Sequence, residues 1–153
     1  MRYERYNPEV SPDVLTFEFM SIGPKGKVSK VVIYSKLPIK NLYNLGFGDR
    51  NIETGAINDL VVTDNKDSKK VLATVAFTAY AFINKYPKAL IILRGSTKAR
   101  TRLYQMGISN NLEEISIDFN VYGRKDRMWY AFEKNVEYDT FLITHKKNRR
   151  WKI

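Results

Sequence analysis

A cluster of cations and hydroxyl groups surrounds one turn in the middle of the chain. Gly95-Ser96-Thr97 interrupts an apolar run, and Ser96 or Thr97 can cap a helix that follows. Backbone amides at a helix start, hydroxyl groups and clustered cations together suit a phosphate group or a nucleic-acid backbone. The alternative is a well-capped surface helix that carries ordinary solubilising charges. The predicted anion site consists of Arg94, Ser96, Thr97, Lys98, Arg100 and Arg102.

The remaining residue types exclude several chemistries. His145 is the one histidine of the chain, which argues against a Ser-His-Asp triad and against a metal site built from histidines. The absence of cysteine excludes disulfides, cysteine-ligated zinc and thiol catalysis. The sequence therefore predicts no metal site.

Aromatic residues alternate with cations near the C-terminal end. If these rings lined an open face of a sheet, they could stack single-stranded bases beside the cations. The alternative places them in the core or at the rim of a sheet. The rings are Tyr122, Trp129, Tyr130 and Phe132, and the cations are Arg124, Lys125 and Arg127.

A long apolar helix is predicted ahead of the cationic cluster. Residues 68–86 contain neither Gly nor Pro and are apolar on almost every face, which indicates a helix packed on most sides. Asp67 or Ser68 is expected to cap its first turn, and Pro87 to end it. The segment is too short and too polar for a membrane span, which needs about 20 apolar residues.

A buried strand and a basic helix should hold the cluster itself. Residues 89–95 form a short apolar run ended by Gly, typical of a strand buried on both faces. The basic helix is predicted to run from Lys98 to Met106 and to end at Gly107. Arg100 and Tyr104, four residues apart, can stack as a cation–π pair. The expected inward residues of this helix are Ala99, Leu103 and Met106, and the outward ones are Lys98 and Arg102.

Strands are predicted on both sides of this central unit. The order of elements is four strands, helix, strand, helix, two strands. It indicates an α+β or α/β fold with a mixed, mostly antiparallel sheet of about six or seven strands and two principal helices. The expected strands are 16–23 and 26–38, joined by a turn at 23–26, then 41–49, 56–64, 89–95 and 112–123, and one or two within 128–147 with a turn at 133–135.

Composition sets the broad class of the protein. The 153 residues, 44% of them hydrophobic, predict a single folded domain over 1–153. Residues 1–15 are expected to form an extended lead-in, and residues 146–153 a mobile basic tail. The net charge of +10 favours contact with polyanions such as nucleic acid. Without a signal segment or a membrane span, we expect a cytoplasmic protein with no membrane partner.

The middle third resembles the GNAT acetyltransferase superfamily. The likeness covers AINDLVV, the helix 68–86, ALIILRG and STKARTRLYQMGI. The last piece is similar to the late helix of that family, which commonly has Ala…Leu-Tyr-x-x-x-Gly, although the spacing here is one residue shorter. The resemblance implies that Tyr104 protonates the departing coenzyme A thiolate and that Asp59 lies near the general base.

The cofactor turn of that superfamily is replaced in this sequence. The family holds the coenzyme pyrophosphate on a glycine-rich turn at the start of its central helix, where phosphate approaches the backbone closely. Here the corresponding stretch 63–71, TDNKDSKKV, has no glycine and two carboxylates. The whole chain is also similar to a family of small bacterial proteins without known function, through FGD, TGAINDL, KVLATVA and GSTKARTRLYQMGI.

These observations leave several functions open. We favour a non-catalytic binding module without a cofactor, on an acetyltransferase-like fold, for an anionic partner such as nucleic acid. The alternative is a divergent acyl-coenzyme A N-acyltransferase with Tyr104 as general acid and Asp59, directly or through water, as general base. A third candidate is a metal-free ribonuclease that uses Tyr104 and Arg102. A protein–protein adaptor also remains open.

Overall fold

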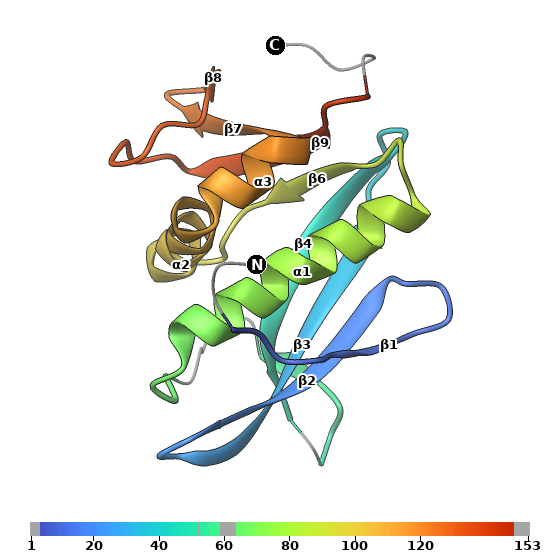
Figure 1. Cartoon of the computed structure of the whole chain (residues 1–153), viewed down its shortest axis with the longest axis vertical. Helices are drawn as coiled ribbons and strands as arrows, with labels where there is room; N and C mark the ends of the chain where they lie inside the picture. The colour runs from blue at the N-terminus through green and yellow to red at the C-terminus, as the bar shows by residue number, and fades with distance from the viewer. Residues whose placement is uncertain (1–3, 52, 59–63, 149–153) are drawn as a thin grey trace.

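The computed structural model describes residues 4–51, 53–58 and 64–148. Within these residues, three helices lie on one face of a mixed, mostly antiparallel sheet (Figure 1). The predicted α+β class is therefore confirmed, and the described residues hold slightly more strands than the six or seven expected, because two-residue strands join the sheet. No helix among the described residues is long and apolar enough to cross a membrane.

The first half of the sheet is an antiparallel meander. The strands β2 (Thr16–Gly23), β3 (Gly26–Lys36) and β4 (Leu42–Arg50) pair in sequence order, as predicted. The two-residue strand β1 (Glu9–Val10) extends the outer edge along β2, and β5 (Ile57–Asn58) pairs with the end of β4. Of the strand predicted over 56–64, the part at 59–63 lies outside the described residues.

The helix α1 (Ser68–Lys85) carries the chain from the meander to the second half of the sheet. The strand β6 (Leu90–Leu93) then pairs with β4 in parallel. The strand β9 (Thr140–His145) lies between β6 and β7 (Phe119–Lys125), and β8 (Met128–Ala131) forms the far edge. The helices α2 (Lys98–Asn110) and α3 (Leu112–Asp118) connect β6 to β7.

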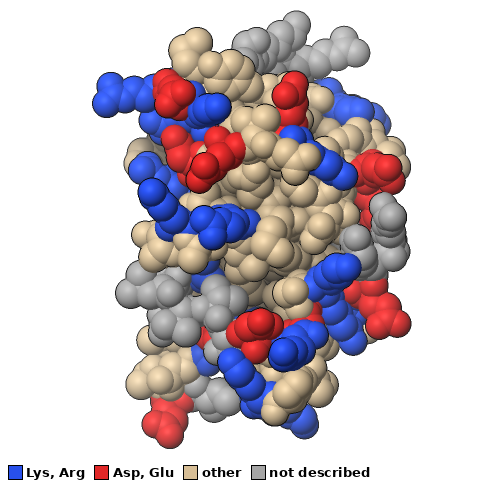
Figure 2. Space-filling view, turned by 90° about the vertical axis from the view of Figure 1, so that its left-hand side faces the viewer, with Lys and Arg blue, Asp and Glu red and all other residues tan. Residues whose placement is uncertain are grey.

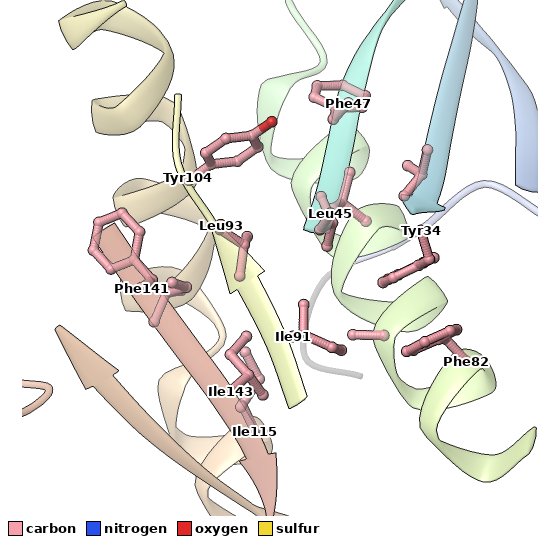
Figure 3. Close-up of a cluster of buried hydrophobic side chains, with 14 of the residues drawn as sticks. Tyr34, Leu45, Phe47, Phe82, Ile91, Leu93, Tyr104, Ile115, Phe141 and Ile143 are labelled. Carbon is pink, nitrogen blue, oxygen red and sulfur yellow. The ribbon is translucent and has the colours of Figure 1, made fainter. Parts of the chain in front are cut away.

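The core fills the space between the sheet and the helices. Tyr34 and Phe82 stack with their ring centroids 4.1 Å apart, and Phe17 meets the edge of Tyr34. The parallel pairing of β4 with β6 ends at Asn44 and Ile92, after which the two strands diverge. Figure 3 shows Tyr104 of α2 in the resulting wedge, with its hydroxyl directed toward Phe47 of β4.

Two boundaries differ from the prediction. Gly107 does not end α2, which continues to Asn110, because this glycine allows close packing on α1. A Cβ added there would lie 3.2 Å from a methyl group of Leu72. The strand predicted over 112–123 is wrong in its first half, since 112–118 form α3. Ile115 is buried and Ile117 is 70% exposed, so their alternation does not reflect a strand.

Candidate anion-binding groove

The turn between β6 and α2 is built as the sequence predicts. Thr97 is the N-cap, and its Oγ1 accepts a hydrogen bond of 3.1 Å from the backbone N of Arg100. Gly95 is required because the turn folds back on the first turn of the helix. A Cβ on Gly95 would lie 2.3 Å from the backbone N of Thr101. This tight turn holds the residues on either side of Gly95 against the start of α2.

A groove of about 980 Å³ runs along α2 and contains five of the six predicted anion-site residues. These five side chains are all exposed. Lys125, at the end of β7, lines the same groove, although it is distant in sequence. We call this feature the α2 groove. The polar and cationic residues of its lining include Arg94, Ser96, Thr97, Lys98, Arg102 and Lys125.

The lining of the α2 groove also contains acidic residues. It includes Asp126, Glu137 and Asp139. The loop that carries Glu137 is fixed to α2 by Gln105, whose amide group donates to Val136 O and accepts from the backbone N of Tyr138. Figure 2 shows the side of the molecule at the left of Figure 1, where basic and acidic side chains are interspersed. An anion in the groove is therefore expected to lie close to α2, away from the acidic loop.

Arg100 does not belong to the α2 groove, and its prediction as an exposed anion-site residue is wrong. It is 3% exposed, and its guanidinium lies 5.4 Å from the centroid of the Phe47 ring. The prediction of inward residues is also wrong for Ala99, which is exposed, and for Met106, which is 45% exposed. The inward face of α2 consists of Arg100, Tyr104 and Ile108, because a long arginine stem and an aromatic partner make burial on this side favourable.

Arg100 lines a separate cavity of about 350 Å³ between α1 and α2, together with Lys30 and Asn65. Lys30 is 1% exposed and forms an ion pair of 2.5 Å with Asp49. Asn65 is also 1% exposed, and its amide nitrogen donates to Gly26 O at 2.9 Å. The Asn65 bond joins the loop before α1 to the start of β3, and the Lys30–Asp49 pair joins β3 to β4.

Side chains from the N-terminal segment and from β2 hold the start of α1. Asp67 occupies the N-cap position, as predicted, but its carboxylate makes no capping bond. It accepts instead from the hydroxyls of Tyr6 and Ser21, each at 2.6 Å. Burial and the neighbouring Asp67 carboxylate raise the pKa of the Tyr6 phenol. The loop packs tightly on the 23–26 turn, where a Cβ on Gly23 would lie 2.0 Å from Asn65 O.

Two of the three residues assigned to the enzymatic alternatives, Tyr104 and Arg102, lie among the described residues. Tyr104 is 5% exposed in the wedge between β4 and β6, next to an apolar cavity of about 40 Å³. Asp59 lies outside the described residues. Arg102 is exposed, and it is two positions from Tyr104 on α2, so the two side chains point in different directions.

His145 packs within the second half of the sheet. Its ring meets the Phe119 ring edge to face at 5.4 Å, and its Nδ1 accepts a hydrogen bond from the backbone N of Lys147. In the described part of the chain, no three His, Asp or Glu side chains are grouped as metal ligands.

The chain belongs to a family of unknown function, DUF6934, whose model matches residues 2–146. A comparison with curated proteins finds no match, and a comparison with solved structures finds none.

Proposed function

We propose that this protein is a non-catalytic binding module whose partner is a polyanion with phosphate groups, bound along the α2 groove. The observation that carries the proposal is that exposed cations from two separate segments face one groove. Arg94, Lys98 and Arg102 come from the β6–α2 region, and Lys125 comes from β7. Phosphate-bearing chains present repeated negative charges, which suit cations spaced along a helix.

The groove also offers polar groups for hydrogen bonds. The Ser96 hydroxyl lies beside the cations, and Thr97 holds the first turn of α2 in place through its cap. Because the Thr97 side chain already accepts from the helix, its role is to order the backbone near the anion. Contacts of this kind position a phosphate chain without reading its sequence.

We propose further that the fold is GNAT-like. What supports this likeness is the parallel pair of β4 and β6 with α1 as its connection, together with the divergence of these strands around Tyr104. The absence of glycine in 63–71 and the bonds made by Asp67 and Asn65 favour a module that has lost a coenzyme turn. No cofactor is needed for the proposed binding.

An acyl-coenzyme A transferase is the second candidate, favoured by the position of Tyr104 in the wedge. Its apolar cavity of about 40 Å³ is on the scale of a few water molecules, so an acyl-thioester arm would require the wedge to open. A titration with coenzyme A, followed by backbone amide shifts, tests this candidate. Shifts at 64–71 and around Tyr104 would support it, and their absence at millimolar coenzyme would exclude it.

Binding of labelled inorganic polyphosphate and of single-stranded RNA at low salt tests the main proposal. The groove variant changes Arg94, Lys98 and Arg102 to Gln. A matched control changes three exposed lysines on other elements to Gln and has the same net charge. The control residues are Lys25, Lys27 and Lys85.

The groove variant should bind both probes more weakly by on the order of tenfold or more, because charge-assisted contacts to phosphate are lost. The control variant should bind nearly as well as the wild-type protein. Equal losses in the two variants would mean that only net charge attracts the probes, and would overturn the proposal.

A further inference from the structure

We infer that the open face of the β7–β8 hairpin stacks the bases of single-stranded nucleic acid on Tyr122 and Trp129. This inference rests on the proposed function, because it identifies the polyanion of the α2 groove as a nucleic acid. The two rings come from neighbouring strands, and the described helices all lie on the opposite face of the sheet (Figure 1).

The register of the strands places the rings on the same face. Arg124 lies directly opposite Trp129, and Tyr122 is two positions from Arg124, so all three share one side of the β7–β8 hairpin. Val121 lies on the other side, where it is 8% exposed in the core. Tyr122 and Trp129 remain partly exposed.

The surroundings of the two rings suit nucleobases. Leu142 and Thr140 of β9 lie opposite Tyr122 and Arg124, but each is only 2% exposed, so the groups that a base can reach here are the two rings and Arg124. Aromatic faces stack on any base, and a neighbouring arginine contributes charge and further stacking. Arg124 is the cation that the register of β7 and β8 places on this face, and its Nε lies 4.0 Å from Asp139 Oδ1.

The hairpin tip connects this open face to the α2 groove. Asp126 and Arg127 both have positive φ, 50° and 66°, which makes a tight turn between β7 and β8. Lys125, just before the turn, lines the groove, whereas Arg124 lies on the open face. A single strand can therefore place phosphates beside Lys125 and bases on the rings by passing around the tip.

Fluorescence of Trp129 tests the inference. In a Trp151→Phe background, Trp129 is the sole tryptophan, and its emission is followed during titration with a short oligothymidylate. Inorganic polyphosphate is the second probe, since it offers phosphates without bases. Oligothymidylate should quench Trp129, and polyphosphate should leave its emission nearly unchanged.

Affinity measurements with end-labelled oligothymidylate complete the test. Tyr122→Leu and Trp129→Leu should each weaken binding by about fivefold or more, as expected for the loss of one stacked base. Trp129→Phe keeps a ring and should retain most of the affinity, which separates stacking from a general loss of structure. Tyr130→Leu is the matched control, because Tyr130 is 47% exposed on the same strand but opposite Gly123, on the other face.

The outcomes separate this inference from the proposed function. If polyphosphate and oligothymidylate bind equally well and Trp129 is not quenched, the groove binds phosphate but the open face does not stack bases, and the inference is overturned. If the groove variant binds polyphosphate as well as the charge-matched control does, the proposed function fails instead. Equal losses for Tyr130→Leu and Trp129→Leu would also contradict the assignment of the open face.

Discussion

Replacing Gly123 by Ala should destabilise the protein, because the added methyl group would clash with Tyr138, which lines the α2 groove. A Cβ at this position would lie 2.4 Å from the ring of Tyr138, which is buried and covers β7. The ring cannot move aside freely, because its hydroxyl accepts from Glu133 N and its backbone N donates to Gln105. The side chain and its loop must therefore shift together.

Overpacking of this kind costs about 1–3 kcal/mol. For a chain of this length, that cost corresponds to a fall in Tm of roughly 2–12 °C. Differential scanning calorimetry measures this change. Gly46→Ala is the matched control, because Gly46 also lies in a strand but its nearest neighbour to an added Cβ is 3.7 Å away. The control should change Tm little, and it can even stabilise the protein by restricting the unfolded chain.

A double-variant comparison checks the cause of the loss. Tyr138→Ala removes the ring, so Gly123→Ala should cost much less in that background than in the wild-type protein. If the two substitutions are additive, or if Gly123→Ala melts within a degree or so of Gly46→Ala, the reasoning about this contact is refuted.

Three further predictions concern stability and the groove. Lys30→Met should lower the unfolding free energy by about 3 kcal/mol in urea titrations, because Asp49 loses its buried partner, and adding Asp49→Leu should recover much of it. Burial raises the pKa of the Tyr34 phenol in the folded state. The contribution of this phenol to the free energy of unfolding is therefore fully present below the unfolded pKa of about 10 and is lost at higher pH. Between about pH 9 and about pH 11, a range around the unfolded tyrosine pKa, the Tyr34→Phe variant should therefore lose less folding stability than the wild-type protein. An equal loss in the two proteins would exclude Tyr34 as the cause. Thr97→Asp should keep the cap and the Tm but weaken polyphosphate binding, and unchanged binding would remove Thr97 from the site.

Local patterns predicted most of the regular elements. The alternation in 16–23 and 26–36 and the turn between them require only neighbouring residues, and so does the cap at Thr97. The apolar surface of 68–85 likewise indicates a helix wherever it packs. These elements agree with the structure because their sequence signals do not depend on distant partners.

The incorrect predictions concern residues whose positions depend on contacts with residues distant in sequence. Arg100 is buried because Phe47, from β4, provides a partner for its guanidinium. The residues next to Arg100 in the sequence do not indicate this burial. Gly107 looks like a helix end, but its lack of a side chain serves contact with Leu72 of α1. Lys125 could not be assigned to the groove from sequence, because the pairing of β7 with β9 brings it there. The groove as a whole is thus a product of the tertiary structure.

The salt dependence of RNA binding tests the central claim most directly. The logarithm of the binding constant is measured against the logarithm of salt concentration for three proteins: wild type, the groove variant at Arg94, Lys98 and Arg102, and the control variant at three distant lysines. For a single strand, each phosphate contact contributes about 0.7 to the slope. The groove variant should lose about 2 units of slope by this estimate, and the control should keep the wild-type slope. Identical slopes in the two variants would contradict binding in the α2 groove.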